Sequence, residues 1–451
     1  MRSLDWTFPA LALGAAALVL VPALAVPFSV TGDSLDLGQR DFRVFNNFTD
    51  PTADDNLQEH PEFPGATGAV AAIWKACVEW GSELHASGDG DPSQARDLGS
   101  GGANFDPSFQ GEALGVGSAD ANVFSELDAF GGGTLAFTEI PTSDGWRIRF
   151  YAEPTVWHDG PGSPPSGPND WDLQGIAAHE YGHALGLNHT PVPGATMGVS
   201  SADRGVDLRS IEEDDRLGVQ AIYGVRLATK PHVATYRLDA GQLEIRGAHF
   251  AAAGNEVWLT RATPAADVED GSPIVAAGLA ASDGGTRLRL SVPAEAGAGD
   301  LLVRVPGDAG SSLSNAFPFD PSREPCRQPT TYGVAKTTST GSVPSLFTTG
   351  LPSAALGRFE IGTLGGVGGE TGVLFYGAHR AAVPFQGGTL LVAPPHVRDQ
   401  TFDFFFGAVV LYVPIAPGMV GETRCYQLWF RDPGDPFGSG LSDGVRVTFC
   451  P

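Results

Sequence analysis

The stretch His179-Glu-Tyr-Gly-His-Ala-Leu-Gly-Leu-Asn-His189 decides how the chain around it must fold. Its first two histidines stand four residues apart, so on a helix they project from the same face, one turn apart. Gly186 lets the chain leave that helix in a left-handed turn, which can swing His189 back toward the first two. The spacing therefore predicts three imidazoles that converge on one point.

Three imidazoles with an open fourth position are a ligand set of catalytic zinc ions. We expect His179, His183 and His189 to bind zinc. We expect Glu180 to point into the same cleft and to take a proton from the water on the metal. The short pattern His-Glu-x-x-His also arises by chance in helices that bind nothing. The added glycine and third histidine contribute nothing to the stability of a helix. The full stretch from His179 to His189 therefore favours a metal site over a pair of structural histidines.

The stretch resembles the zinc signature of the metzincin metallopeptidases. Met197 follows His189 by eight residues and resembles the methionine that this family places in a turn beneath the metal. A lone methionine in a loop more often fills a hydrophobic core, so the evidence for a methionine turn is the position of Met197 and not its residue type. The run Ile211–Gly224 resembles the closing helix of the matrixin branch, whose paired aspartates brace the methionine turn and the mature N-terminus. The resemblance gives this role to Asp214 and Asp215, although first-turn aspartates also stabilise a helix dipole.

The matrixin resemblance covers about residues 40–225 and implies an α+β catalytic domain with a twisted mixed sheet and three helices. Local patterns agree with it. Residues 40–46 read as a strand, and from Thr67 to His85 the apolar residues recur at three and four, which predicts one long helix. Two antiparallel strands flank Pro141–Gly145, the second running toward Asp159. An edge of this pair next to the zinc cleft would bind an extended peptide.

Capping residues set the expected helix ends. Asn169, Asp170 or Asp172 can cap the helix that carries the histidines. The run Ser210–Glu213 predicts a capping box that opens a later helix ending at Gly224. One matrixin feature is missing, because no cysteine precedes Cys77. Latency through a pro-segment cysteine is therefore not expected.

The first residues of the chain carry an export signal. Arg2 precedes an apolar run, and Ala23-Leu-Ala25 has the small-x-small pattern of a cleavage site, so residues 1–25 are expected to be a signal peptide. A retained membrane anchor is the alternative, but the run is short for a bilayer. No later stretch could span a membrane. We expect a secreted protein, extracellular or in the cell envelope.

Charge limits the partners. The net charge of -25 argues against nucleic acid and against an anionic membrane surface, which both require clustered Lys and Arg. Residues 99–133 are rich in Gly, Asn and Asp and could bind calcium, but ordinary turns are favoured. His158 next to Asp159 is favoured as a surface residue, although matrixins carry extra metal sites in this region.

A length of 451 residues suggests about three domains. After a short linker at 226–231, residues 230–320 alternate apolar and polar between turn residues, predict a β-sandwich and resemble an IPT/TIG immunoglobulin-like domain. Residues 325–451 are β-rich and resemble a C-terminal module of secreted bacterial proteins. Its aromatic residues could form a carbohydrate-binding or surface-binding face, although core packing is favoured.

Four cysteines allow three pairings. Three of them, Cys326, Cys425 and Cys450, lie in the last segment. We expect a disulfide within that segment. Cys77 is then expected to be a buried free thiol.

Together these features predict a secreted zinc metalloendopeptidase that hydrolyses peptide bonds of extracellular proteins, with Glu180 as general base. Activity should fall in mild acid, because the histidines must be neutral to bind zinc. The alternative is a surface adhesin or matrix-binding protein with a degenerate protease domain, since about half of the chain lies outside that domain. The intact histidines and Glu180 favour the enzyme.

Overall fold

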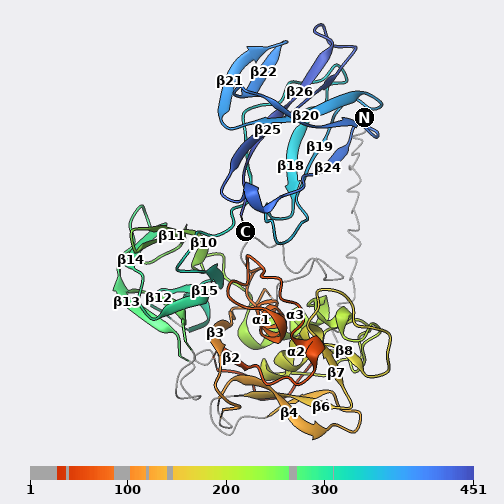
Figure 1. The fold of residues 1–451 in the computed structure, drawn as a ribbon. Coiled ribbons are helices and arrows are strands. Elements are labelled where there is room, and N and C mark those ends of the chain that lie inside the picture. The colour runs from red at the N-terminus through yellow and green to blue at the C-terminus, as the bar shows by residue number, and fades with distance from the viewer. Residues whose placement is uncertain are drawn as a thin grey trace, which may run out of the picture.

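The computed structural model describes residues 28–36, 40–85, 102–117, 121–139, 146–263, 272–307 and 309–450. These residues build three units, each around a hydrophobic core of its own. Figure 1 shows the N-terminal unit (28–225) below, the middle unit (230–320) beside it and the C-terminal unit (325–450) above. The expected signal peptide and the turn at Pro141–Gly145 lie outside the described residues.

The N-terminal unit contains a five-stranded mixed sheet in the order β3-β2-β4-β6-β5. Strands β3, β2, β4 and β6 are parallel, and β5 is the antiparallel edge strand. Two short pairs, β1–β9 and β7–β8, lie outside the sheet. The strands are β1 (Ser29–Val30), β2 (Asp41–Phe45), β3 (Ser108–Glu112), β4 (Val123–Phe130), β5 (Ala136–Thr138), β6 (Arg147–Glu153), β7 (Val156–His158), β8 (Asp170–Asp172) and β9 (Leu187–Asn188).

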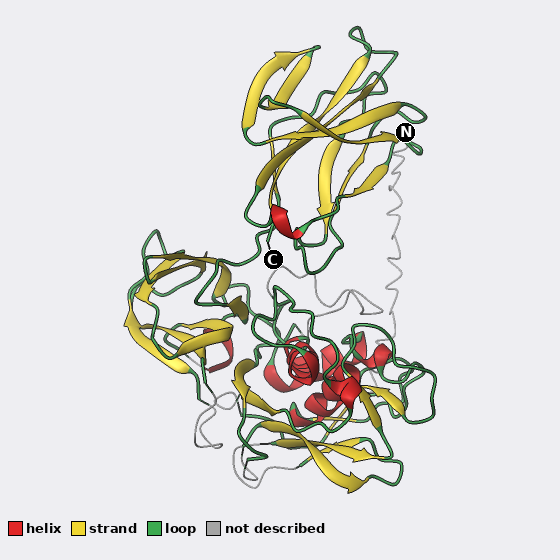
Figure 2. Cartoon of the chain, viewed as in Figure 1, coloured by secondary structure: helices red, strands yellow, loops and turns green. Residues whose placement is uncertain are grey.

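Most of the helix in the molecule lies in this unit, as Figure 2 shows. Helices α1 (Gly68–Val78) and α2 (Leu173–Ala184) are almost entirely buried, whereas α3 (Glu213–Tyr223) buries one face. Short 3-10 turns occupy Pro51–Ala53 and Val206–Leu208. Apolar side chains of all three helices and of the sheet share one core.

The predicted helix from Thr67 to His85 is too long, because α1 ends at Val78. Beyond it the chain continues in tight turns, with the N–H of Gly81 donating to the carbonyl of Val78. Both the N–H and the hydroxyl of Ser82 then donate to Asp106 Oδ1, at 3.0 and 2.9 Å. A tertiary contact therefore replaces the helical bonds that the apolar spacing would allow. Similarly, β6 ends at Glu153 instead of running on toward Asp159, since Pro154 has no N–H to donate.

The middle unit is a sandwich of two antiparallel sheets, β10-β11-β14 and β13-β12-β15-β16, which share one core. Its only described helix is the single turn α4 (Ala309–Ser312). The strands are β10 (His232–Asp239), β11 (Gln242–Ala248), β12 (Asn255–Arg261), β13 (Ile274–Leu279), β14 (Arg287–Ser291), β15 (Ala296–Arg304) and β16 (Phe317–Phe319).

The C-terminal unit packs a five-stranded sheet, β17-β26-β25-β20-β23, against a three-stranded sheet, β18-β19-β24, and adds the hairpin β21–β22. A 3-10 turn spans Pro417–Met419. The strands are β17 (Thr330–Tyr332), β18 (Ser345–Thr349), β19 (Glu360–Leu364), β20 (Thr371–Gly377), β21 (Arg380–Phe385), β22 (Gly388–Val392), β23 (Val397–Asp403), β24 (Val409–Tyr412), β25 (Thr423–Arg431) and β26 (Ser439–Thr448).

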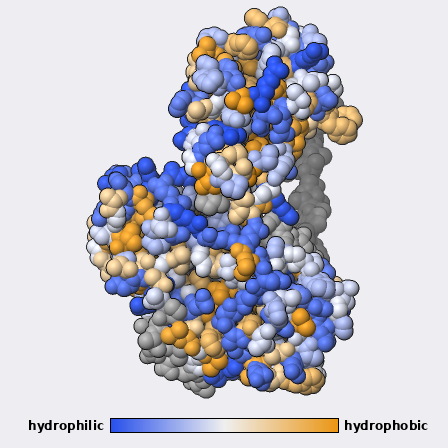
Figure 3. Space-filling model, in the orientation of Figure 1, coloured by the Kyte–Doolittle hydropathy of each residue, from blue (hydrophilic) through white to orange (hydrophobic). Residues whose placement is uncertain are grey.

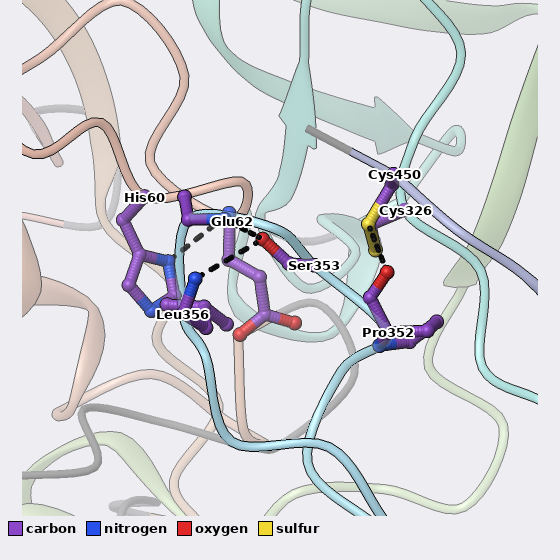
Figure 4. Close-up of a disulfide and its surroundings, with 8 residues drawn as sticks. His60, Glu62, Cys326, Pro352, Ser353, Leu356 and Cys450 are labelled. Carbon is purple, nitrogen blue, oxygen red and sulfur yellow. Dashed lines mark hydrogen bonds between the residues drawn. A yellow bond between two sulfur atoms is a disulfide. The ribbon is translucent and has the colours of Figure 1, made fainter. Parts of the chain in front are cut away.

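A disulfide joins Cys326 to Cys450, which confirms the expected bond within the last segment. Cys77 is a buried free thiol, as expected, and Cys425 is a second one. Figure 4 shows that the loop with Pro352 and Ser353 lies between the disulfide and His60 and Glu62 of the N-terminal unit. The disulfide therefore sits close to where these two units meet.

The expected linker at 226–231 is not a free tether. Lys230 is buried, and its Nζ lies 2.6 Å from Asp106 Oδ2 of the N-terminal unit. Nearby, His85 Nε2 lies 3.1 Å from Asp300 Oδ1, across the boundary between the N-terminal and middle units. A buried ion pair and a buried histidine–carboxylate contact therefore fix these two units to each other. The view of the surface in Figure 3 shows polar and apolar side chains mixed over all three units.

Candidate metal centre

Helix α2 carries the centre, and its start is fixed by a buried side-chain cap. Asp172 Oδ1 accepts a hydrogen bond of 2.7 Å from the N–H of Gly175, so Asp172 is the cap among the three expected candidates. The Arg209 guanidinium also pairs with the Asp172 carboxylate, and both side chains are buried. Trp80 Nε1 donates to the carbonyl of Ala178 at 3.0 Å, which ties α2 to the turn after α1.

The structure brings together the three histidines that the sequence singled out. One ring nitrogen from each of His179, His183 and His189 lies within 4.8 Å of the others, and His179 Nε2 is 3.1 Å from His189 Nε2. The Nδ1–H of His179 donates to the carbonyl of Thr196 at 2.7 Å, and that of His183 donates to the carbonyl of Leu187 at 2.8 Å. With Nδ1 occupied, Nε2 is left as the metal-binding atom of both rings.

Burial keeps the imidazoles of His179 and His183 neutral, which is the form that binds a metal. Burial, with a smaller contribution in the same direction from the neighbouring His183, lowers the pKa of His179 to about 3. Burial also lowers the pKa of His183. The donor set, three imidazoles around a shared point of which two have a fixed tautomer, fits a zinc ion.

Gly186 makes the turn that places the third histidine. Its φ of +99° lies in the left-handed region, directly after α2 ends and before β9 begins. A Cβ at this position would lie 2.8 Å from the carbonyl oxygen of Asp33 and 2.9 Å from Ser34 Cβ. Glycine is therefore required here both for the backbone conformation and for the close passage of the N-terminal segment.

Glu180 is buried and lines the same cleft as His183 and His189. Thr138 of the edge strand β5 donates its hydroxyl toward the Glu180 carbonyl at 2.7 Å and toward Glu180 Oε2 at 3.0 Å. Burial raises the pKa of Glu180 to about 7, against the opposing effect of the Thr138 hydrogen bond. A carboxyl group with a pKa near neutrality is suited to general base and acid chemistry.

Met197 lies buried beneath α2, where a Cβ on Gly182 would come within 2.2 Å of its sulfur. The Asp215 carboxylate accepts hydrogen bonds from the N–H of Thr196 at 2.7 Å and from that of Met197 at 3.0 Å. Asp215 thus braces the turn, in the way that the resemblance implied. Asp214 is also buried, but neither of its carboxylate oxygens has a hydrogen-bond partner among the described residues.

Asp215 also corrects the expected capping box. The box forms between Glu212 and Asp215, not over Ser210–Glu213, and α3 begins at Glu213 and ends before Gly224. The carbonyl of Ser210 instead accepts a hydrogen bond of 2.6 Å from the Thr196 hydroxyl. The methionine turn therefore uses both Ser210 and Asp215, which moves the helix start two residues along the chain.

The three histidines form the only group of three or more possible metal-binding side chains among the described residues. His158 Nε2 lies 2.7 Å from Asp170 Oδ1, so this histidine pairs with a carboxylate on the neighbouring strand. Calcium binding by the 99–133 region stays a prediction. The predicted carbohydrate or surface ligand of the C-terminal unit also stays one. Several of its aromatic residues are core residues, among them Tyr426 and Phe430, whereas Phe405 and Phe406 are exposed.

Three supporting residues escaped the sequence analysis. Thr138 lies on a short strand with no motif, and Thr196 and Arg209 lie in irregular chain between the helices. Their roles depend on contacts with Glu180, His179 and Asp172. The only available signal was that Thr196 directly precedes Met197.

Comparison with known proteins agrees with this geometry. Residues 58–224 match the family model described as matrixin. Human neutrophil collagenase is 46% identical over 56 residues, which are 12% of this chain and 12% of that protein. Metalloendoproteinase 5-MMP of Arabidopsis thaliana is 46% identical over 55 residues, 12% of this chain and 14% of that protein. The chain thus spans about an eighth of the length of these relatives.

Among solved structures, SGBP-B from a complex xyloglucan utilization locus in Bacteroides uniformis aligns over 47% of this chain and 48% of its own. The sequence identity is 11% and the TM-score is 0.17. The matrixin match and the histidine triad together support a zinc metallopeptidase.

Proposed function

We propose that this chain is a secreted zinc metalloendopeptidase that cleaves peptide bonds in extracellular proteins. The observation that carries the proposal is the convergence of His179, His183 and His189 at a cleft that also holds the buried Glu180. The cleft has a volume of about 360 Å³, and most of its exposed lining surface is apolar.

The three histidines would hold the zinc ion through one nitrogen each. When bound, zinc supplies a Lewis acid that polarises a peptide carbonyl and makes water a nucleophile near neutral pH. Glu180 accepts the proton of the attacking water on its carboxylate and then donates it to the amine nitrogen of the leaving product. Thr138, which also lines the cleft, orients that carboxylate through its hydroxyl.

The substrate would bind along β5. This strand is the edge of its sheet, and all three of its residues, Ala136, Phe137 and Thr138, line the cleft. An edge strand leaves backbone donors and acceptors open, so an extended peptide can add to the sheet. The peptide would then pass directly by the histidines and Glu180.

Secretion rests on the leader-like residues 1–25 and on the disulfide between Cys326 and Cys450, a bond typical of oxidising compartments. No helix among the described residues is long and apolar enough to cross a membrane.

The test is cleavage of casein by the zinc-loaded full-length protein, with and without a chelator, beside the variant Glu180→Ala. We expect chelator-sensitive cleavage by the wild type and a loss of at least about a hundredfold in the variant, which still binds zinc. If wild type and variant are equally inert while both hold zinc, the proposal is wrong and the adhesin alternative gains.

A further inference from the structure

The segment 28–36 precedes the part of the chain that matches matrixin, yet it forms part of the cleft wall. Its strand β1 pairs antiparallel with β9, directly before His189. The N–H of Thr31 donates to the carbonyl of Gly186 at 2.9 Å, and that of Leu35 donates to the carbonyl of Ala184 at 3.0 Å. The segment is therefore hydrogen-bonded to the end of α2 on both sides of Asp33.

Further contacts hold the segment in place. The side chain of Leu35 is buried, and its carbonyl accepts a hydrogen bond of 3.1 Å from the Tyr223 hydroxyl of α3. A Cβ on Gly218 would lie 3.4 Å from Phe28 Cγ, so the Phe28 ring packs directly on α3. The Thr31 hydroxyl donates to the carbonyl of Asp33 at 2.7 Å. The position of Asp33 is therefore fixed by the hydrogen bonds of Thr31 on one side and of Leu35 on the other.

Asp33 is exposed and lines the cleft beside His183 and His189. Among the described residues that line the cleft, Asp33 and Glu180 are the only acidic side chains and none is Lys or Arg. Among the residues that the structure describes, no cation pairs with the Asp33 carboxylate. An unpaired carboxylate at a fixed place in a mainly apolar cleft is available to a positive charge on a ligand.

We propose that Asp33 determines substrate specificity by selecting peptides that carry a lysine or arginine next to the scissile bond. The inference rests on the proposed peptidase function and adds the chemical class of its substrate. The net charge of -25 acts in the same direction, since it steers cationic peptides toward the protein at low ionic strength.

The experiment uses three series of peptides. Each series carries one test residue, which is lysine, norleucine or glutamate, and this residue is moved in turn through the positions that flank the cleaved bond. The kcat/KM of each is measured for the wild type, Asp33→Asn and Asp33→Lys. The matched control is Asp36→Asn, which removes the same charge from the same segment but outside the cleft lining. Melting temperatures establish that the variants are folded.

At one of these flanking positions, the wild type should have a higher kcat/KM for the lysine peptide than for the norleucine peptide. Asp33→Asn should reduce that ratio about two- to fivefold, the effect of one partly exposed ion pair. Asp33→Lys should shift the preference toward glutamate, and Asp36→Asn should keep the wild-type ratio. With the wild type alone, raising the salt concentration should lower the lysine preference.

An unchanged ratio in Asp33→Asn, or a wild-type preference that salt does not alter, would overturn the inference while leaving the peptidase proposal intact. A uniform gain on all three peptides would overturn it too, and would identify segment 28–36 as an inhibitory strap. If the wild type cleaves no peptide at all, the proposed function itself fails.

Discussion

The hydroxyl of Thr138 lies 3.0 Å from Glu180 Oε2, so the edge strand that would bind a peptide also holds the base that would cleave it. This hydrogen bond stabilises the charged carboxylate and opposes the effect of burial on the Glu180 pKa. In the proposed function, substrate binding and proton transfer would therefore both depend on one short strand, β5.

Replacing Thr138 by valine should reduce kcat/KM about ten- to a hundredfold, since a hydrogen bond to a charged group contributes roughly 1.5–3 kcal/mol. The acid limb of the pH profile should also move to higher pH, because the carboxylate loses a donor. Thr134→Val, at an exposed position just before β5, is the control. If the acid limb of the pH profile does not move in Thr138→Val, Thr138 stabilises the fold but does not affect the pKa of Glu180.

Activity and metal binding should separate as the pH falls. Burial raises the pKa of Glu180 to about 7, and the base works only when deprotonated, so activity is lost as the pH falls through this value. A bound dication lowers that pKa, which puts the midpoint at or below pH 7. The pKa of His179 is about 3, so protons compete with the metal at this ring only at much lower pH.

The measurement is kcat/KM against pH, beside zinc content after dialysis at each pH. Protein at about pH 5 should retain zinc while its activity has dropped. This refines the expectation from the sequence, which attributed the acid loss to the histidines. Loss of activity and zinc at the same pH would restore that earlier explanation.

Gly186→Ala should weaken zinc binding and stability together. The new Cβ would occupy a left-handed conformation, at a cost of about 1–3 kcal/mol, and would press on the Asp33 carbonyl. We expect a lower zinc affinity by chelator competition and a lower melting temperature. Gly162→Ala is the matched control, since a Cβ there meets open space. Wild-type zinc affinity in Gly186→Ala would contradict the role of this turn.

Asp106→Asn should destabilise the junction of the N-terminal and middle units. It leaves Lys230 buried without its counter-charge, which typically costs about 3–5 kcal/mol. Urea unfolding measures the loss. Glu256→Gln weakens the half-exposed pair with Arg304 and should cost less than about 1 kcal/mol. Equal effects of the two changes would mean that Lys230 and Asp106 do not hold the units together.

The sequence predicted the convergence of the three histidines well, because its information is local. The spacing of three histidines and Gly186 specifies one helix and one turn, and the structure contains both. Asp172 could likewise be expected as a cap from its place before the apolar positions.

What the sequence could not predict depends on tertiary contacts. The Ser82–Asp106 bonds end the turns after α1, and the Thr196 hydroxyl donates to the carbonyl of Ser210, which the sequence placed in a capping box. Thr138 and Asp33 carry no motif and gain meaning only through the chain segments they face. Such pairings join residues far apart in sequence, which neither periodicity nor local propensity encodes.

The bond between Cys326 and Cys450 spans almost the entire C-terminal unit, with a sequence separation of 124 residues. A single backbone cut anywhere between these two cysteines would leave both fragments covalently attached. For a secreted peptidase, the function proposed above, this disulfide means that one backbone cut in an exposed loop of the C-terminal unit does not release a fragment of it.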